Sequence, residues 1–139
     1  MKDDWSTIEY KWPDKTESKF FRKNLAPAIQ PGSLSHPFVC YLTFGYAKTG
    51  PSGLPTSEDA NLLVDIEESE IFSLENEGLA ILVGVVFGDG IKDFIFYSKN
   101  DQHFNDWASQ IQNKYPNFEI SFLATKDLEW SQYHELPSP

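Results

Sequence analysis

The sequence predicts an α+β fold, and three observations lead to this prediction. Two apolar runs flank Gly88-Asp89-Gly90 and indicate a central β-hairpin, because glycine and Asp supply the positive backbone angles of a tight turn. From Phe38 onward the patterns read strand, helix, strand, strand, helix, strand. The chain has 139 residues, of which 40% are hydrophobic, enough for one domain with a core. The predicted architecture is a ferredoxin-like split βαβ sandwich, an antiparallel sheet with two helices and an N-terminal strand extension.

The central hairpin spans Leu79 to Tyr97. Its first run, Leu79–Phe87, is apolar at nearly every position and therefore suits an interior strand covered on both faces. In the second run Phe94 and Phe96 share one face with Lys92, by the period-two alternation of a strand. The opposite face carries Ile91, Asp93, Ile95 and Tyr97.

Strands are also predicted on either side of a Pro-rich and Gly-rich loop at residues 26–37. Residues 1–24 form the predicted extension, with an edge strand at Trp5–Trp12, ended by Pro13, and a short strand at Lys19–Asn24. The segment Phe38–Tyr46 alternates cleanly and should be a strand. We expect it to lie between the strands at Ile91–Tyr97 and Phe118–Phe122. Its buried face would carry Phe38, Cys40, Leu42, Phe44 and Tyr46.

An acidic helix is predicted from Thr56 to Glu77. Thr56 and Asp59 have the form of a capping box, and Gly78 is placed to end the helix. Its apolar stripe contains Leu62, Leu63, Ile66 and Leu74. Glu70, however, projects toward this stripe, and Phe72 projects from the acidic side. Either the helix breaks near Ser69 and returns Phe72 to the core, which we favour, or Phe72 stands in solvent among carboxylates.

The C-terminal part should contain a helix, a strand and a short helix. Ser98 and Asp101 form a second capping-box pattern, and Lys114 and Pro116 suit the end of the helix. Its apolar positions are Phe104, Trp107, Ala108, Ile111 and Tyr115. Phe118–Phe122 alternates as a strand with one buried face, and Asp127–His134 should pack Leu128 and Trp130 onto the domain. We therefore expect a single domain over 1–139, with a βαββαβ core at 38–123.

Charge is the most informative property of the composition. The net charge is −10, and the segment Glu58–Glu77 holds eight acidic residues and no basic one. Such a field repels nucleic acids and anionic membranes, and it attracts basic partners. The only cysteine, Cys40, should be a buried strand residue. Because the N-terminus is polar and no apolar run spans a membrane, we expect a soluble cytoplasmic protein.

The sequence indicates no reaction. The histidines His36, His103 and His134 have no second ligand at metal-site spacing, so we predict no metal and no cofactor. Paired carboxylates such as Glu67 and Glu68 are typical of a solvated face within so acidic a run. No residue qualifies as catalytic.

The landmarks resemble a known bacterial family. They are an N-terminal strand with a Trp, the tripeptide Gly53-Leu54-Pro55, the acidic DIEE of Asp65–Glu68, LVGVVFGDGIKDFIFYS at Leu82–Ser98, and a late Trp130 and Tyr133. This order resembles the family catalogued as domain of unknown function 695, over most of the chain. The family has no assigned reaction, and some relatives are fused to a domain similar to regulator of ribonuclease activity B, a small acidic ribonuclease-E inhibitor. Family members tend to have Arg where this chain has Lys92, which leaves the role of that position open.

The leading functional hypothesis is a non-enzymatic acidic binding protein, of inhibitor or immunity type, that masks a basic partner such as a toxin or nuclease. Its docking patch would comprise Asp65, Glu68, Phe72 and Glu75, which lie within about 80° of one another on a straight helix. One alternative is an enzyme or small-ligand binder with a site near Lys92, Tyr97, His103 and Trp107. Another is a structural domain without a specific partner.

Overall fold

The fold is built on one six-stranded antiparallel sheet in the order β1-β2-β4-β5-β3-β6. A computed structural model describes residues 4–11, 18–50 and 53–138. The strands are β1 (Trp5–Lys11), β2 (Ser18–Asn24), β3 (Phe38–Gly45), β4 (Ala80–Gly88), β5 (Ile91–Ser98) and β6 (Glu119–Lys126). The α+β class is thus confirmed, as are both strands of the predicted N-terminal extension. Trp12 and Pro13, the predicted end of the first strand, lie outside the described residues.

The strand β3 lies between β5 and β6, as the βαββαβ order of the elements predicted. Phe44 faces Lys92 on one side and Ile120 on the other, and both pairings are antiparallel. β6 continues to Lys126, beyond the predicted end at Phe122. Within β3, Cys40 is fully buried, and burial together with the charge of Asp101 raises the pKa of its thiol to about 12.

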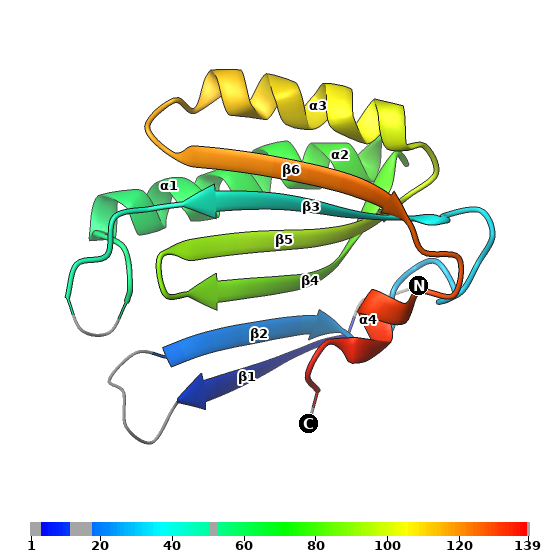
Figure 1. The fold of residues 1–139 in the computed structure, drawn as a ribbon, viewed down its shortest axis with the longest axis horizontal. Helices are drawn as coiled ribbons and strands as arrows, with labels where there is room; N and C mark the ends of the chain where they lie inside the picture. The colour runs from blue at the N-terminus through cyan, green and yellow to red at the C-terminus, as the bar shows by residue number, and fades with distance from the viewer. Residues whose placement is uncertain (1–3, 12–17, 51–52, 139) are drawn as a thin grey trace.

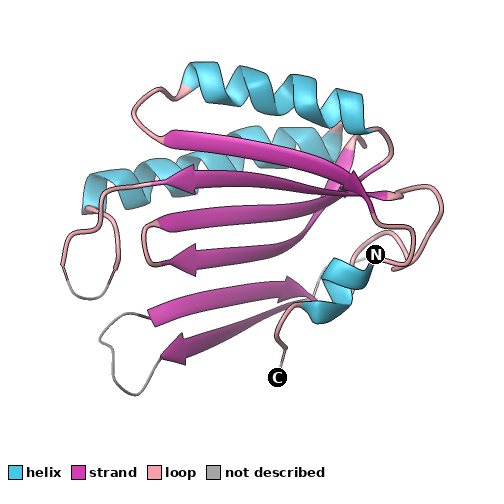
Figure 2. Ribbon diagram, in the orientation of Figure 1, coloured by secondary structure: helices cyan, strands magenta, loops and turns pink. Residues whose placement is uncertain are grey.

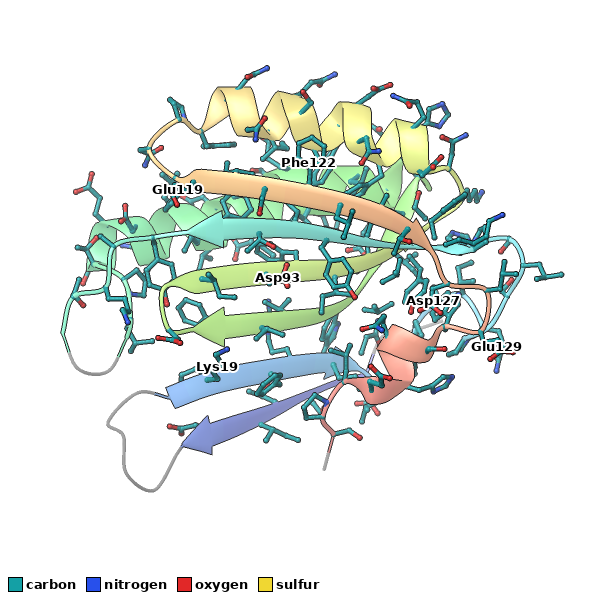
Figure 3. The ribbon with its side chains drawn as sticks, in the orientation of Figure 1. Lys19, Asp93, Glu119, Phe122, Asp127 and Glu129 are labelled. Atoms are coloured by element: carbon teal, nitrogen blue, oxygen red, sulfur yellow. The ribbon has the colours of Figure 1, made fainter. Side chains whose placement is uncertain are left out.

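The sheet is covered differently on its two faces. Helices α1 (Ser57–Ile66), α2 (Phe72–Asn76) and α3 (Asp101–Lys114) cover one face, and the short α4 (Ser131–Glu135) lies against the other (Figure 1). The larger core lies under the three helices, and Phe122 packs there between β6 and α3 (Figure 3). The smaller core, on the α4 side, comprises Val39, Val83, Ile95, Tyr97, Trp130 and Tyr133. None of the helices in the described part of the chain has the length and apolar character of a membrane span.

A bulge in β4 changes which of its residues face the helices. Leu82 pairs with Phe96 but Gly84 pairs with Ile95, so the strand contains one extra residue at Val83. Before the bulge Leu82 faces the helices, and after it Val85 does. Gly84 allows a close approach, because a Cβ at this position would lie 2.6 Å from Leu136 Cδ1. The strand is covered on both faces over most of its length, as predicted, but Val86 and Phe87 near its end are only half-buried.

The acidic helix is interrupted by a π-helical turn, η1 (Glu67–Ile71), between α1 and α2. Thr56 caps α1 as predicted, since its hydroxyl accepts a hydrogen bond from Asp59 N at 3.1 Å. The extra residue of a π turn rotates the next helical segment backward, so Ile71 takes the core position that Glu70 would hold on a regular helix. The break near Ser69 is confirmed, but the expected return of Phe72 to the core is wrong. Phe72 is 59% exposed.

Two further expectations about helix ends are corrected. α3 is capped by Asn100, whose side chain accepts from His103 N at 3.0 Å, and not by Ser98, which instead accepts from Asn100 N. The C-terminal helix begins at Ser131 and not at Asp127. The Asp127 carboxylate accepts hydrogen bonds from the first turn of α4, and Trp130 adopts a left-handed conformation that separates the turn from the helix. Trp130 is buried as expected, whereas Leu128 is exposed.

Candidate functional site

The predicted docking residues do not form one patch, because the π turn redistributes them around the helix. Asp65 lies on the side of α3, where its charge affects the pKa of Tyr115. Burial and the hydrogen bond to Glu70, together with the charges of Glu70 and Asp65, raise that pKa to about 12. Glu75 turns toward the sheet, and its Oε2 accepts a hydrogen bond from Leu82 N at 3.1 Å. Only Glu68 and Phe72 remain together.

Val64 joins Glu68 and Phe72 to form an exposed row, which we call the ridge. A regular helix would place Phe72 nearer to Asp65 than to Val64, but the backward rotation of the π turn brings it into line with Val64 and Glu68. All three ridge residues are exposed. The ridge thus presents two apolar side chains on either side of a carboxylate.

Several of the acidic residues already have partners within the protein. Glu67 Oε1 lies 2.6 Å from Arg22 Nη2, and Glu70 Oε2 lies 2.7 Å from Lys114 Nζ. Glu70 also accepts from the hydroxyl of Tyr115 at 2.7 Å; burial opposes ionisation of Glu70, but these bonds and the Lys114 charge together lower its pKa. With Glu75 bonded to Leu82, the field that a partner meets is weaker than the eight acids of the sequence imply.

A groove with a volume of about 440 Å³ runs beside the ridge. β1 and β2 extend the sheet beyond the strands that lie under α3, so their helix-side face is left partly open (Figure 2). The β4 bulge turns Val85 and Phe87 toward this opening, opposite Arg22 and Phe20 of β2. The groove is lined by Thr7, Phe20, Arg22, Val64, Glu67, Glu68, Val85, Phe87 and Lys92.

A cluster of three charged residues forms the floor of the groove. Lys92 is only 8% exposed, and its Nζ lies 3.6 Å from Glu67 Oε1, the same oxygen that binds Arg22. The rings of Phe87 and Phe94 lie 5.3 and 5.4 Å from this Nζ. Burial and the neighbouring Arg22 charge lower the pKa of Lys92, and Glu67 opposes that change only in part.

The residues of the predicted alternative site are not brought together. Tyr97 lies on the α4 side of the sheet, where its ring stacks on Trp130 with centroids 3.9 Å apart. Consecutive residues of β5 point to opposite faces, so Phe96, next to Tyr97, points to the helix side, where Trp107 of α3 packs against it. His103 is exposed on α3, and Lys92 lies near the opposite end of β5.

The Tyr97 hydroxyl belongs to a hydrogen-bond network that holds α4 in place. It donates to Asp127 Oδ2 at 2.6 Å and accepts from Tyr133 N at 3.1 Å. Burial and the bond to Asp127 raise the pKa of Tyr97. Burial works against ionisation of Asp127, but hydrogen bonds from Tyr97, Gln132 N and Ser131 lower its pKa. Asp127 and Glu129 lie in the segment that leads from β6 to α4 (Figure 3).

Sequence reasoning missed Arg22, Glu67 and the aromatic walls of the groove. A signal existed, since Lys92 shares a face with Phe94 and Phe96, and a charge on an apolar face needs a partner. Its partners lie far from it in sequence, however, on β2 and on the π turn.

Among the described residues, no group of three or more His, Cys, Asp or Glu side chains is arranged to hold a metal ion.

Comparison with known proteins gives a family but no described relative. The model of a family described as a family of unknown function, DUF695, matches residues 3–136, nearly the whole chain, as the landmarks in the sequence predicted. No curated protein and no solved structure matches the chain.

Proposed function

The chain belongs to this family of unknown function, and we propose that it is a non-enzymatic binding protein of inhibitor or immunity type that masks a basic partner, such as a toxin or nuclease. The observation that carries the proposal is the exposure of Phe72, 59%, beside Glu68 on an acidic helix. Phe typically fills protein cores and the centres of interfaces, so a Phe side chain this exposed to solvent is unusual. We place the protein in the cytoplasm, where a single buried cysteine stays reduced.

The ridge combines an apolar anchor with charge. Glu68 lies between Val64 and Phe72, so a partner that covers both apolar side chains also meets a carboxylate. Asp65 adds negative charge from the α3 side. Complementary charge of this kind accelerates association and sets the orientation of the complex, whereas the buried aromatic anchor supplies most of the affinity.

Glu75 contributes to the fold and not to the proposed contact. Its bond to Leu82 N satisfies a backbone donor of β4, so we confine the docking surface to the ridge and Asp65. Glu67 and Glu70 are also excluded, because Arg22 and Lys114 already bind them.

We also propose that β3 to β6 with α1 and α3 form a ferredoxin-like unit, and that residues 1–139 are a single domain. The order β4-β5-β3-β6, with every neighbouring pair antiparallel, supports the first proposal because each crossover helix then joins parallel strands separated by one other strand. The presence of β1 and β2 in the same sheet supports the second.

Variants of the ridge test the proposed function. A basic partner is captured from lysate at low salt and identified, and its association and dissociation rates are measured against ionic strength. The double variant Asp65→Lys and Glu68→Lys should slow association about tenfold or more and reduce its salt dependence. Phe72→Ala should weaken the complex by about 2 kcal/mol or more, mainly through faster dissociation.

Leu123→Ala is the matched control, because Leu123 on β6 is 58% exposed, almost the same as Phe72. Both truncations should change the free energy of unfolding by less than about 0.5 kcal/mol, and Leu123→Ala should leave the rates unchanged. Equal effects of the two truncations on binding, or unchanged association of the charge-reversed double variant, would disprove docking at the ridge.

A further inference from the structure

Lys92 is a buried cation with too few acceptors around it. Among the described residues, the carboxylate that pairs with its Nζ is that of Glu67, whose Oε1 lies 3.6 Å away, longer than an ordinary hydrogen bond. The other neighbours are the rings of Phe87 and Phe94. An ammonium group has several donors, and those that Glu67 does not reach face the groove that Lys92 lines. This group therefore favours an additional anionic acceptor in the groove.

The charges on the floor of the groove do not balance. Arg22 and Lys92 share one oxygen of one carboxylate, which leaves an excess of one positive charge on the floor. Glu68, which also lines the groove, carries the balancing negative charge on the ridge. Arg22 binds Glu67 through Nη2 and lies over the ring of Trp5, so its planar group still has donors to offer. A guanidinium beside an ammonium is well suited to a carboxylate.

The apolar walls of the groove indicate the chemical character of the rest of the ligand. Phe20 and Phe87 stand together, with ring centroids 6.3 Å apart, and Val64 and Val85 complete the apolar surface. A volume of about 440 Å³ lies within the range of small-molecule sites. Glu67 remains on the floor and would repel a doubly charged anion such as phosphate, so a single negative charge fits best.

We propose that the groove binds a small organic carboxylate with an apolar or aromatic body, whose carboxylate contacts Lys92 and Arg22 and whose body packs against the rings of Phe20 and Phe87. This inference goes beyond the proposed docking function: the ridge residues Val64 and Glu68 also line the groove, but Phe72, the proposed anchor, does not. The bound carboxylate would complete the coordination of Lys92 and cover the open face of β2 and β4.

The test is a titration with phenylacetate, octanoate, phenylacetamide and inorganic phosphate, followed by backbone amide shifts and calorimetry on the full chain. The two carboxylates should bind with saturation and shift residues of β2, η1 and the second half of β4. The neutral amide and phosphate should bind at least about tenfold more weakly. Equal binding of the amide would reveal an apolar crevice only, and equal binding of phosphate a general anion site. Either result, or no saturable binding of either carboxylate, would overturn the proposal.

Variants assign the binding to the charged floor. Lys92→Met should weaken carboxylate binding at least about tenfold, and Arg22→Met should do the same if Lys92→Met fails to fold. Lys114→Met is the control, because Lys114 pairs with Glu70 on the α3 side of the helix. Phe72→Ala should leave carboxylate affinity unchanged, because Phe72 does not line the groove. The docking proposal and the carboxylate proposal can therefore fail independently. Unchanged affinity in the folded Lys92→Met and Arg22→Met variants would exclude the assignment.

Discussion

Lys92 shows how one charged residue organises the packing around it. Its face of β5 is otherwise apolar, with Phe94 and Phe96 fully buried beside it. The nearest carboxylate, that of Glu67, is at the same time held by Arg22 at 2.6 Å. Because Arg22 binds Glu67 more closely than Lys92 does, at 2.6 Å against 3.6 Å, Lys92 is not needed to neutralise it. Its burial is therefore a cost to the fold that a ligand would offset.

The first prediction concerns the variant Lys92→Met. At neutral pH we expect it to be as stable as the parent or about 1 kcal/mol more stable, because an apolar side chain of similar length replaces a poorly paired buried ion. Urea unfolding measures the change. A loss of more than about 1 kcal/mol would contradict this interpretation, and Lys114→Met serves as the surface control.

The contribution of Lys92 to stability should change with pH in a defined direction. The pKa of Lys92 is lowered in the folded state by burial and by Arg22, despite Glu67. Between this lowered pKa and 10.5 the unfolded chain binds more protons, so the contribution of Lys92 to stability rises with pH. Tyr97 and Tyr133, whose pKa values burial raises, act in the opposite direction. The quantity to measure is therefore the stability of the parent minus that of Lys92→Met, which should increase as the pH rises toward 10.5.

At the scale of elements, the π turn decides which residues of the acidic helix face the core. Leu63 and Ile66 are buried before it, and Ile71 and Leu74 after it. The turn also places Glu70 beside α3 and Phe72 in solvent. Ser69, within the turn, donates to Asp65 O at 2.7 Å and occupies an exposed position. The extra residue thus separates two helical segments whose apolar positions keep a common face.

The second prediction is that deletion of Ser69 is tolerated. The deletion converts the π turn into regular α-helix and leaves Leu63, Ile66, Ile71 and Leu74 at the spacing of one amphipathic face. We expect the free energy of unfolding to change by less than about 1 kcal/mol.

Deletion of Ser109 from α3 is the control, since α3 has no extra residue to lose and Ile111 would leave the core. That deletion should cost roughly 2 to 5 kcal/mol. Urea unfolding and circular dichroism compare the two deletions, and equal costs would show that the π turn is required for the fold.

At the scale of the whole molecule, the C-terminal segment joins parts of the chain that are distant in sequence. Trp130 stacks on Tyr97 and donates from Nε1 to His36 O at 2.9 Å. Tyr133 donates from its hydroxyl to Asn24 O at 2.7 Å. These contacts cover the sheet face opposite the three helices. The smaller core therefore depends on residues near the end of the chain.

The third prediction is that Trp130→Ala destabilises the protein by roughly 3 to 5 kcal/mol, as expected for a fully buried large side chain. Leu128→Ala, two residues away and 47% exposed, should change stability by less than about 0.5 kcal/mol. Thermal and urea unfolding of both variants measure the difference. If Trp130→Ala proves as mild as Leu128→Ala, the C-terminal segment is an accessory of the fold and not part of its core.

Patterns that depend on near neighbours could be read from the sequence alone. The alternation in Phe38–Tyr46 predicted β3, which ends one residue earlier at Gly45. Glycine and Asp at the hairpin turn predicted the connection of β4 to β5, and Thr56 with Asp59 marked the start of α1. Strand period, turn conformation and helix capping act over a few residues, so the local sequence determines them.

The tertiary structure decided what depends on contacts between distant segments. Whether Phe72 or Ile71 entered the core depended on the packing of the helices on the sheet: Ile71 belongs to the larger core, and the helix forms a π turn to bring it there. Whether Lys92 was exposed or buried depended on Arg22 and Glu67, which meet only once β2 lies beside β4 and the π turn covers them. The candidate groove exists only in the folded chain, because its walls come from segments that local sequence patterns do not connect.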